Sequence, residues 1–187
     1  LIGFGAGGHD GTMFNILQTL GLSGNCIRCY DAGDISSYNG TAEFWTDRSA
    51  SAVNLDRGTD QTDASNDPTF NGTAGNKSSN EYFSADGGDL FQVTGDVVSA
   101  DIDNFHKDNA TWSAIYLLYK VAGQTAILDN SNQAASNNGT SLYFDAANQL
   151  QLVVGKSGGP AALSALADAA PTANAWHYIG VSINEPT

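Results

Sequence analysis

Positive charge is scarce in this chain. Its 187 residues include 7 Lys and Arg against 20 Asp and Glu, which gives a formal net charge of −13. A surface with this balance repels the phosphate backbone of nucleic acids and lacks the basic patches that bind anionic membranes. No apolar run approaches the ~18 residues of a membrane-spanning helix. We therefore expect neither nucleic-acid binding nor membrane insertion.

Residues for metal and redox chemistry are also few. Two cysteines, Cys26 and Cys29, form a C-x-x-C motif of the kind found in zinc and redox sites. A zinc site needs about four ligands, and the three histidines are scattered along the chain (His9, His106 and His177). A redox motif opens a helix, whereas residues 26–30 have the pattern of a strand. We expect structural cysteines, free or disulfide-bonded to a partner, with metal or redox work as the alternative.

Paired catalytic carboxylates are missing as well. The three glutamates, Glu43, Glu81 and Glu185, lie far apart in the sequence. A retaining glycosidase needs two carboxyl groups about 5–5.5 Å apart, and nothing in this spacing indicates such a pair. None of the histidines stands near a nucleophile-elbow motif. We expect no enzymatic activity and no catalytic residue.

The glycine-rich opening imitates a nucleotide-binding motif. Gly3, Gly5 and Gly8 fit G-x-G-x-x-G, residues 13–22 could form the helix that follows, and Asp31 could end a second strand. Only two residues precede the first glycine, however, and no βαβ units follow Asp31. This makes the dinucleotide-binding interpretation the weaker alternative.

We favour instead a glycine-rich arm over residues 1–25 that contains a short amphipathic helix. Four apolar residues would form one face of this helix: Met13, Phe14, Leu17 and Leu20. Such an arm would dock on a neighbouring subunit. We therefore expect a homo-oligomer that contacts its partners through the arm.

The sequence of the second half of the chain predicts mainly β-strands. Five segments are rich in β-branched and aromatic residues and bounded by turn formers: 111–120, 124–129, 140–145, 149–154 and 175–183. Some alternate with period two, as Leu150 and Leu152 do. Two shorter strands, 82–84 and 90–93, flank an Asp-Gly-Gly-Asp turn, whereas 161–170 has the pattern of a loop. Strands without intervening helices predict an antiparallel sandwich.

Three short stretches carry a family resemblance: Tyr30-Asp31-Ala32-Gly33-Asp34, Trp45-Thr46-Asp47-Arg48-Ser49, and Trp176-His177 at the start of the last strand. With them, the chain from Arg28 to Ile183 resembles the laminin-G-like, concanavalin A-like jelly rolls of phage tail fibres, head spikes and other secreted binding proteins. The resemblance implies a mainly β, antiparallel jelly-roll sandwich over residues 26–187. In that family, the strand that begins with Trp-His is followed by an Asn-Gly or Asp-Gly turn and then by the last strands of the sandwich. We expect those last strands to be missing here.

The resemblance also implies a function. Members of the family bind glycans, proteins or calcium through rim loops, and the Glu-x-Asp-x-x-Glu motif of glycan-cleaving relatives is absent here. We expect a structural protein on the surface of a phage or phage-like particle, as a tail fibre, head spike or capsid decoration protein. Its arm would hold other particle proteins, and its sandwich would bind host surface polysaccharide. A secreted lectin-like module of a larger adhesin is the alternative.

Candidate site residues lie beside the polar loops. Tyr38 and Trp45 offer aromatic faces to a sugar, and Asp47 offers hydrogen-bond acceptors. Asp31 and Asp34 are candidates for a cation, which makes calcium the one cofactor to consider, although turn capping explains both residues equally well.

Other aromatic and acidic residues are assigned structural roles. Trp112 and Trp176 stand at strand starts among Ile, Leu and Val, so we expect both in the core. The side chain of His177 should then face the opposite side of the sheet and form a hydrogen bond. The loop of residues 50–79 carries four aspartates without the spacing of an EF-hand: Asp56, Asp60, Asp63 and Asp67. A solvated loop is the better interpretation.

Overall fold

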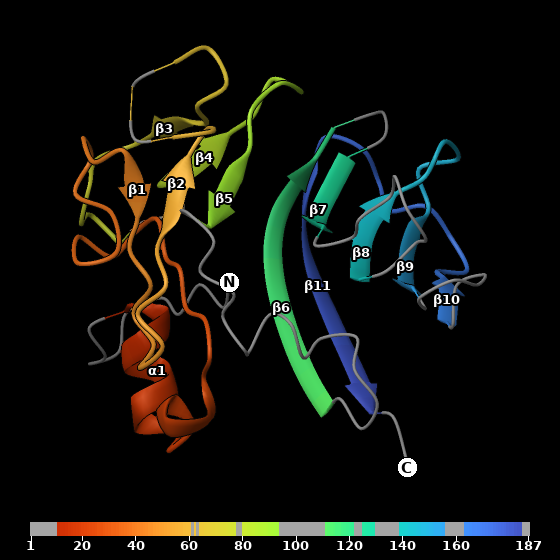
Figure 1. Ribbon diagram of the computed structural model, residues 1–187, viewed down its shortest axis with the longest axis horizontal. Coiled ribbons are helices and arrows are strands. Elements are labelled where there is room, and N and C mark those ends of the chain that lie inside the picture. The colour runs from red at the N-terminus through yellow and green to blue at the C-terminus, as the bar shows by residue number, and fades with distance from the viewer. Residues whose placement is uncertain are drawn as a thin grey trace. The chain divides into compact units, whose positions relative to one another are not determined.

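The chain forms two compact units in a computed structural model (Figure 1). The structure describes residues 11–60, 62, 64–77, 80–93, 111–121, 125–129, 139–155 and 163–184. Ile2–Val97 make up the N-terminal unit and Val98–Thr187 the C-terminal unit. The sequence had predicted one sandwich beginning at residue 26, whereas this division falls after Val97. The glycines of the predicted nucleotide-binding motif lie outside the described residues.

The fold is mainly β with antiparallel sheets, as the sequence predicted. The elements of the N-terminal unit are α1 (Met13–Thr19), a 3-10 turn (Ser23–Asn25), β1 (Phe44–Trp45), β2 (Leu55–Arg57), β3 (Thr69–Asn71), β4 (Tyr82–Ser84) and β5 (Phe91–Val93). They form a sheet of order β1-β2-β5 and a separate β3-β4 pair. Both predicted strands beside the Asp-Gly-Gly-Asp turn exist, but β4 pairs with β3 and β5 with β2. The turn therefore does not close a hairpin.

Helix α1 begins at a capping residue and is shorter than predicted. The Thr12 side chain accepts a hydrogen bond from the Asn15 backbone N–H at 3.3 Å, which satisfies one free donor of the first turn. The helix ends at Thr19 instead of continuing to residue 22, and Gly21 follows with a φ of 70°. No helix in the described part of the chain is long and apolar enough to cross a membrane.

Helix α1 packs on its own unit. The Met13 N–H donates to the Asp31 carboxylate at 2.8 Å, and the Arg48 guanidinium lies 5.6 Å from the centroid of the Phe14 ring. The predicted apolar face is only partly buried: Met13, Phe14 and Leu17 are half-buried, and Leu20, just after the helix, is exposed.

Aromatic rings form the core of the N-terminal unit. Phe83 of β4 lies at the centre, with its ring centroid 4.8 Å from that of Tyr38, 4.9 Å from Trp45, 5.0 Å from Phe91 and 5.5 Å from Phe70. Each such pair adds about 0.5–1.5 kcal/mol beyond the burial of its area. The rings come from four strands and a loop, so they join most of the unit's elements.

The described residues of the C-terminal unit form two antiparallel sheets. Its strands are β6 (Thr111–Lys120), β7 (Thr125–Asp129), β8 (Gly139–Phe144), β9 (Leu150–Gly155), β10 (Leu163–Leu166) and β11 (Ala175–Asn184). Strands β10-β9-β8-β7 form one sheet and β11-β6 the other. The five predicted strands are confirmed. The loop predicted for residues 161–170 is wrong, because β10 pairs there with β9 despite the low strand propensity of alanine.

The two sheets of the C-terminal unit pack face to face. Leu142 and Phe144 of β8 and Ile179 of β11 are its buried centre. Half-buried side chains from β6, β7, β9 and β11 surround them: Tyr116, Leu118, Ile127, Leu128, Leu150, Leu152 and Val181. Strands β6 and β11, which run side by side along ten paired residues (Figure 1), therefore turn one face inward and the other outward.

Candidate functional site

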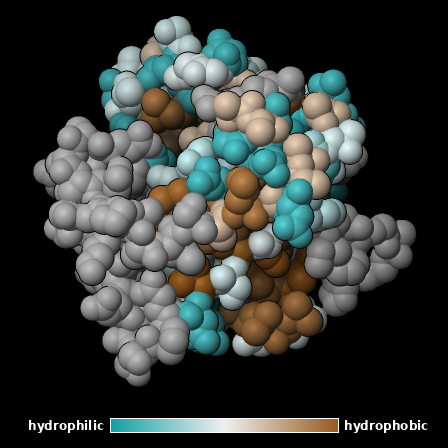
Figure 2. All heavy atoms as spheres, turned by 90° about the vertical axis from the view of Figure 1, so that its right-hand side faces the viewer, coloured by the Kyte–Doolittle hydropathy of each residue, from teal (hydrophilic) through white to brown (hydrophobic). Residues whose placement is uncertain are grey.

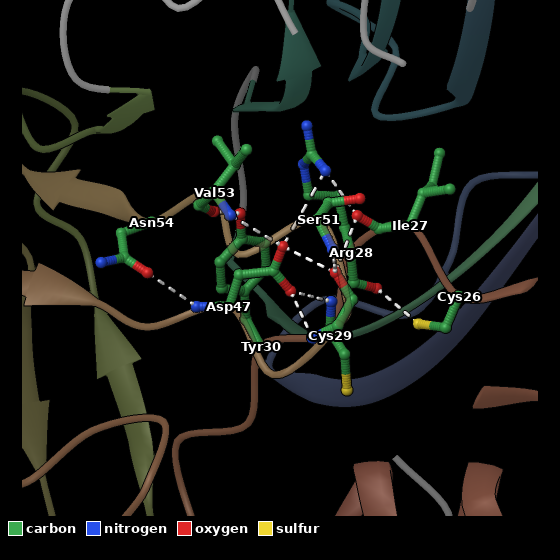
Figure 3. Close-up of polar contacts among 10 residues, drawn as sticks. Cys26, Ile27, Arg28, Cys29, Tyr30, Asp47, Ser51, Val53 and Asn54 are labelled. Atoms are coloured by element: carbon green, nitrogen blue, oxygen red, sulfur yellow. Dashed lines mark hydrogen bonds and ion pairs between the residues drawn. The ribbon is translucent and has the colours of Figure 1, made fainter. Parts of the chain in front are cut away.

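The Asp47 carboxylate is buried and fully engaged by neighbouring groups (Figure 3). It accepts hydrogen bonds from the backbone N–H groups of Cys29 (2.9 Å), Ser49 (2.9 Å) and Val53 (3.2 Å) and from the Ser49 hydroxyl (2.8 Å). The Arg28 guanidinium adds an ion pair at 3.9 Å. These contacts give Asp47 a structural role, in which it joins loops that are distant in sequence.

Asp31 and Asp34 are buried as well, and their carboxylates contact different partners. Asp31 accepts the backbone N–H groups of Met13 (2.8 Å) and Gly33 (2.9 Å). Asp34 caps its own turn and pairs with the Arg48 guanidinium at 3.1 Å. Within the described ranges no three His, Cys, Asp or Glu gather into a group that could hold a metal ion. The contacts of both residues are those of turn and loop caps.

Tyr38 and Trp45 belong to the aromatic core. Tyr38 is only 1% exposed, its ring lies 4.9 Å from that of Phe70, and its hydroxyl is 3.2 Å from the Arg57 guanidinium. Trp45 is half-buried and packs on Phe83. A sugar stacking on Tyr38 would have to displace this core packing. The ligand-binding role predicted for these rings thus gains no support from their positions.

Cys26 and Cys29 are free cysteines in a segment without regular secondary structure. The strand predicted for residues 26–30 is therefore wrong. Cys26 donates to the Arg28 carbonyl at 3.1 Å. Burial raises the pKa of the Cys29 thiol from 9.0 to about 12. Because the thiolate is the form that binds metals and attacks disulfides, this environment favours a structural role.

Exposed aromatic rings gather elsewhere, on the outward face of β6 and β11. Trp176 is 44% exposed and lies opposite Tyr119, which is 46% exposed; their ring centroids are 5.5 Å apart at an interplanar angle of 71°. Tyr178, 60% exposed, follows on the same face, and Ile115 is exposed further along it. We call the outward residues of these two strands the β6–β11 face: Thr111, Ser113, Ile115, Leu117, Tyr119, Trp176, Tyr178, Gly180, Ser182 and Asn184.

The core position predicted for Trp176 is wrong, and the parity of β11 explains why. Ile179 and Ile183 point inward and are buried, so every second residue counted from them also points inward. Trp176 has the opposite parity and faces outward. His177 faces inward, whereas the sequence predicted that it would lie on the side away from the core. The expected hydrogen bond is present, between Nε2 and the Thr172 carbonyl at 2.7 Å. Trp112 has the inward parity and is half-buried, which agrees with its predicted core position.

The β6–β11 face changes from aromatic to polar along its length. At the end away from Trp176, the hydroxyls of Ser113 and Ser182 lie 3.0 Å apart. The Thr111 hydroxyl next to them is 3.1 Å from the Asn184 side-chain oxygen. Gly180 lies between the two ends and has open space where a side chain would stand. Flat rings and hydrogen-bonding groups thus share one surface.

Hydrophobic side chains also reach the surface on the β9–β10 side of the C-terminal unit (Figure 2). Leu166 of β10 is 51% exposed. It is aliphatic and offers no flat ring, whereas the β6–β11 face presents three. Leu166 therefore provides a matched apolar control for that face.

Comparisons of this chain with protein families, curated proteins and solved structures found no match. Function must then be argued from the chemistry of the site and not from a relative. The β6–β11 face combines the two features that suit sugar rings, namely aromatic planes for their C–H faces and polar groups for their hydroxyls.

Proposed function

We propose that the chain is a carbohydrate-binding adhesion protein on the surface of a phage or phage-like particle, and that the β6–β11 face holds the sugar. The observation that carries this proposal is the exposure of Trp176, Tyr119 and Tyr178 beside one another on adjacent strands. No such exposure was expected from the sequence, which placed Trp176 in the core.

The arrangement of these rings suits a pyranose. A sugar ring has an apolar C–H face that packs on an aromatic plane, and Trp and Tyr supply large contact areas together with one polar group each. The edge-to-face packing of Tyr119 on Trp176 holds both rings in place before a ligand arrives. Such preorganisation reduces the entropy lost on binding.

The polar end of the face would orient the bound glycan. Ser113 and Ser182 each carry a hydroxyl that both donates and accepts hydrogen bonds. Because Gly180 has no side chain, a sugar could approach the backbone between the aromatic and the polar ends. These features favour a chain of several sugar units lying along the strands over a single ring.

The net charge of −13 narrows the class of glycan. A strongly acidic protein repels polyanions at long range. Neutral or weakly charged host polysaccharides are therefore the preferred ligands in this proposal.

The finer fold assignment is part of the same proposal. Two antiparallel sheets pack face to face around Leu142, Phe144 and Ile179, which supports a jelly-roll sandwich of the concanavalin A-like, laminin-G-like kind. In the particle, the arm of residues 1–25 would anchor the protein to other particle proteins and to further copies of itself.

One observation favours a second candidate, a secreted lectin-like module of a larger adhesin. Helix α1 is tied to its own unit by the Met13–Asp31 hydrogen bond and by Phe14 under Arg48. A helix held in this way has less surface for a neighbouring subunit. Light scattering of the full chain and of a chain lacking residues 1–25 distinguishes the two candidates. An oligomer that dissociates on truncation supports the particle protein, and a monomer in both cases supports the adhesin module.

A glycan array tests the shared part of both candidates. Fluorescently labelled full chain should bind a subset of neutral bacterial polysaccharides, and W176A should lose those signals while L166A keeps them. Absence of binding to every glycan, or equal binding by both variants, would remove the support for this function.

A further inference from the structure

Lys120, the last residue of β6, is buried to an extent unusual for lysine. Lys120 is only 2% exposed, whereas most lysines keep their ammonium group in water. Nζ lies 3.1 Å from the side-chain oxygen of Asn148 and 4.7 Å from the centroid of the Phe144 ring, and it also donates to the Val121 carbonyl. The chain thus places an amine and a carboxamide in contact, 28 residues apart in sequence, against a fully buried ring.

The turn between β8 and β9 fixes the carboxamide at this position. Asn148 has a φ of 61°, in the left-handed region that Asn tolerates better than most residues. Its N–H donates to the Asp145 carbonyl at 2.9 Å. The Asp145 carboxylate accepts the N–H groups of Ala147 (2.8 Å) and Gln149 (2.9 Å). With its backbone held on both sides, Asn148 keeps its side chain directed at Lys120.

From this geometry we propose that Lys120 and Asn148 join in an intramolecular isopeptide bond. The two groups are the reactants of a transamidation, and holding reactants in contact raises their effective concentration by many orders of magnitude. The enclosed position beside Phe144 also limits the access of water, which would otherwise compete as the nucleophile.

The reaction needs no further reagent. The lone pair of Lys120 Nζ adds to Cγ of Asn148, which forms the new C–N bond. The Cγ–Nδ2 bond then breaks, and the amide nitrogen leaves as ammonia with one proton from the amine. One amide replaces another, so no electron donor or acceptor takes part.

The product would tie the two packed layers of the C-terminal unit together. Lys120 ends β6 in one sheet, and Asn148 lies in the turn between two strands of the other. A covalent link between them would close a loop over residues 120–148 and restrict the unfolded chain. This inference does not depend on glycan binding, and either can fail without the other.

The intact mass of the full chain tests the proposal. Purified folded protein should weigh about 17 Da less than its sequence, the mass of one ammonia. Trypsin should fail to cut after Lys120, so that residues 108–156 appear as one species in place of 108–120 and 121–156. A mass equal to that of the sequence would overturn the proposal.

A succinimide formed by Asn148 alone would give the same mass loss, so two variants complete the test. K120R keeps the positive charge but removes the nucleophilic amine, and N148G suits the positive φ but removes the carboxamide. Both should show the full mass expected from their sequences. If K120R still lacks about 17 Da, Lys120 is not the reacting partner and the proposal is wrong.

Discussion

The Asp47 carboxylate accepts the backbone N–H of Cys29 at 2.9 Å, although the two residues are 18 positions apart. The same carboxylate also accepts the backbone N–H groups of Ser49 and Val53. The buried Asp47 side chain therefore supplies hydrogen bonds that hold together the loop segments around Cys29, Ser49 and Val53. Hydrogen bonds from side chains to backbone groups, more than regular secondary structure, stabilise the conformation of these loops.

Replacing Asp47 with alanine should destabilise the N-terminal unit strongly. The substitution removes the acceptor of several buried N–H groups and the ion-pair partner of Arg28, and breaking a buried charged pair costs about 3–5 kcal/mol. Urea denaturation followed by fluorescence measures the loss. The control is D60A, an exposed loop aspartate, which should change stability by less than about 0.5 kcal/mol. Similar effects from both variants would show that Asp47 does not organise the loops.

The stability of the N-terminal unit should fall above pH 9 because of Cys29. Burial raises the pKa of this thiol from 9.0 to about 12, so the folded state keeps a proton that the unfolded state releases. The contribution is present in full below pH 9 and is lost as the pH rises towards 12, with a slope of at most about 1.4 kcal/mol per pH unit. Unfolding free energies measured at pH 8, 9 and 10 should decline more steeply for the natural chain than for C29A. Parallel curves would contradict this assignment.

Two core substitutions should act on different units. Phe83 is the centre of the aromatic core of the N-terminal unit, and Phe144 is fully buried in the C-terminal unit. Removal of a fully buried phenylalanine such as Phe144 costs about 3–5 kcal/mol, and removal of the half-buried Phe83 should cost less. Hydrogen exchange read peptide by peptide should show F83A raising exchange in residues 11–93 and F144A in residues 111–184. If each variant raised exchange throughout the chain, the two units would unfold as one.

The strands of the C-terminal unit were predictable because their pattern is local. Alternation and bounding turn residues located β6, β8, β9 and β11 within about one residue. Their partners were not predictable, since β6 and β11 pair across more than 50 intervening residues that carry no signal of the pairing. Strand β10 was missed because its Leu-Ser-Ala-Leu sequence forms a strand only through pairing with β9.

The burial of the candidate aromatic residues was not predictable for a related reason. Tyr38 and Trp45 stand among polar loop residues, and that local polarity suggested exposure. Their ring partners Phe70 and Phe83 arrive from distant strands, and only the fold brings them together. For Trp176 the sequence did contain a usable signal, the spacing to Ile179 and Ile183, which assigns it to the outward face once those two are recognised as core.

The affinity of the β6–β11 face for a glycan is the most direct test of the proposed function. Isothermal titration with a polysaccharide selected on the array should give a Kd that W176A and Y178A each weaken by about tenfold or more, since Trp and Tyr at the centre of an interface contribute over 1.4 kcal/mol. L166A, on the other sheet of the same unit, should leave the Kd unchanged. Equal affinities for W176A, Y178A, L166A and the natural chain would contradict sugar binding at this face.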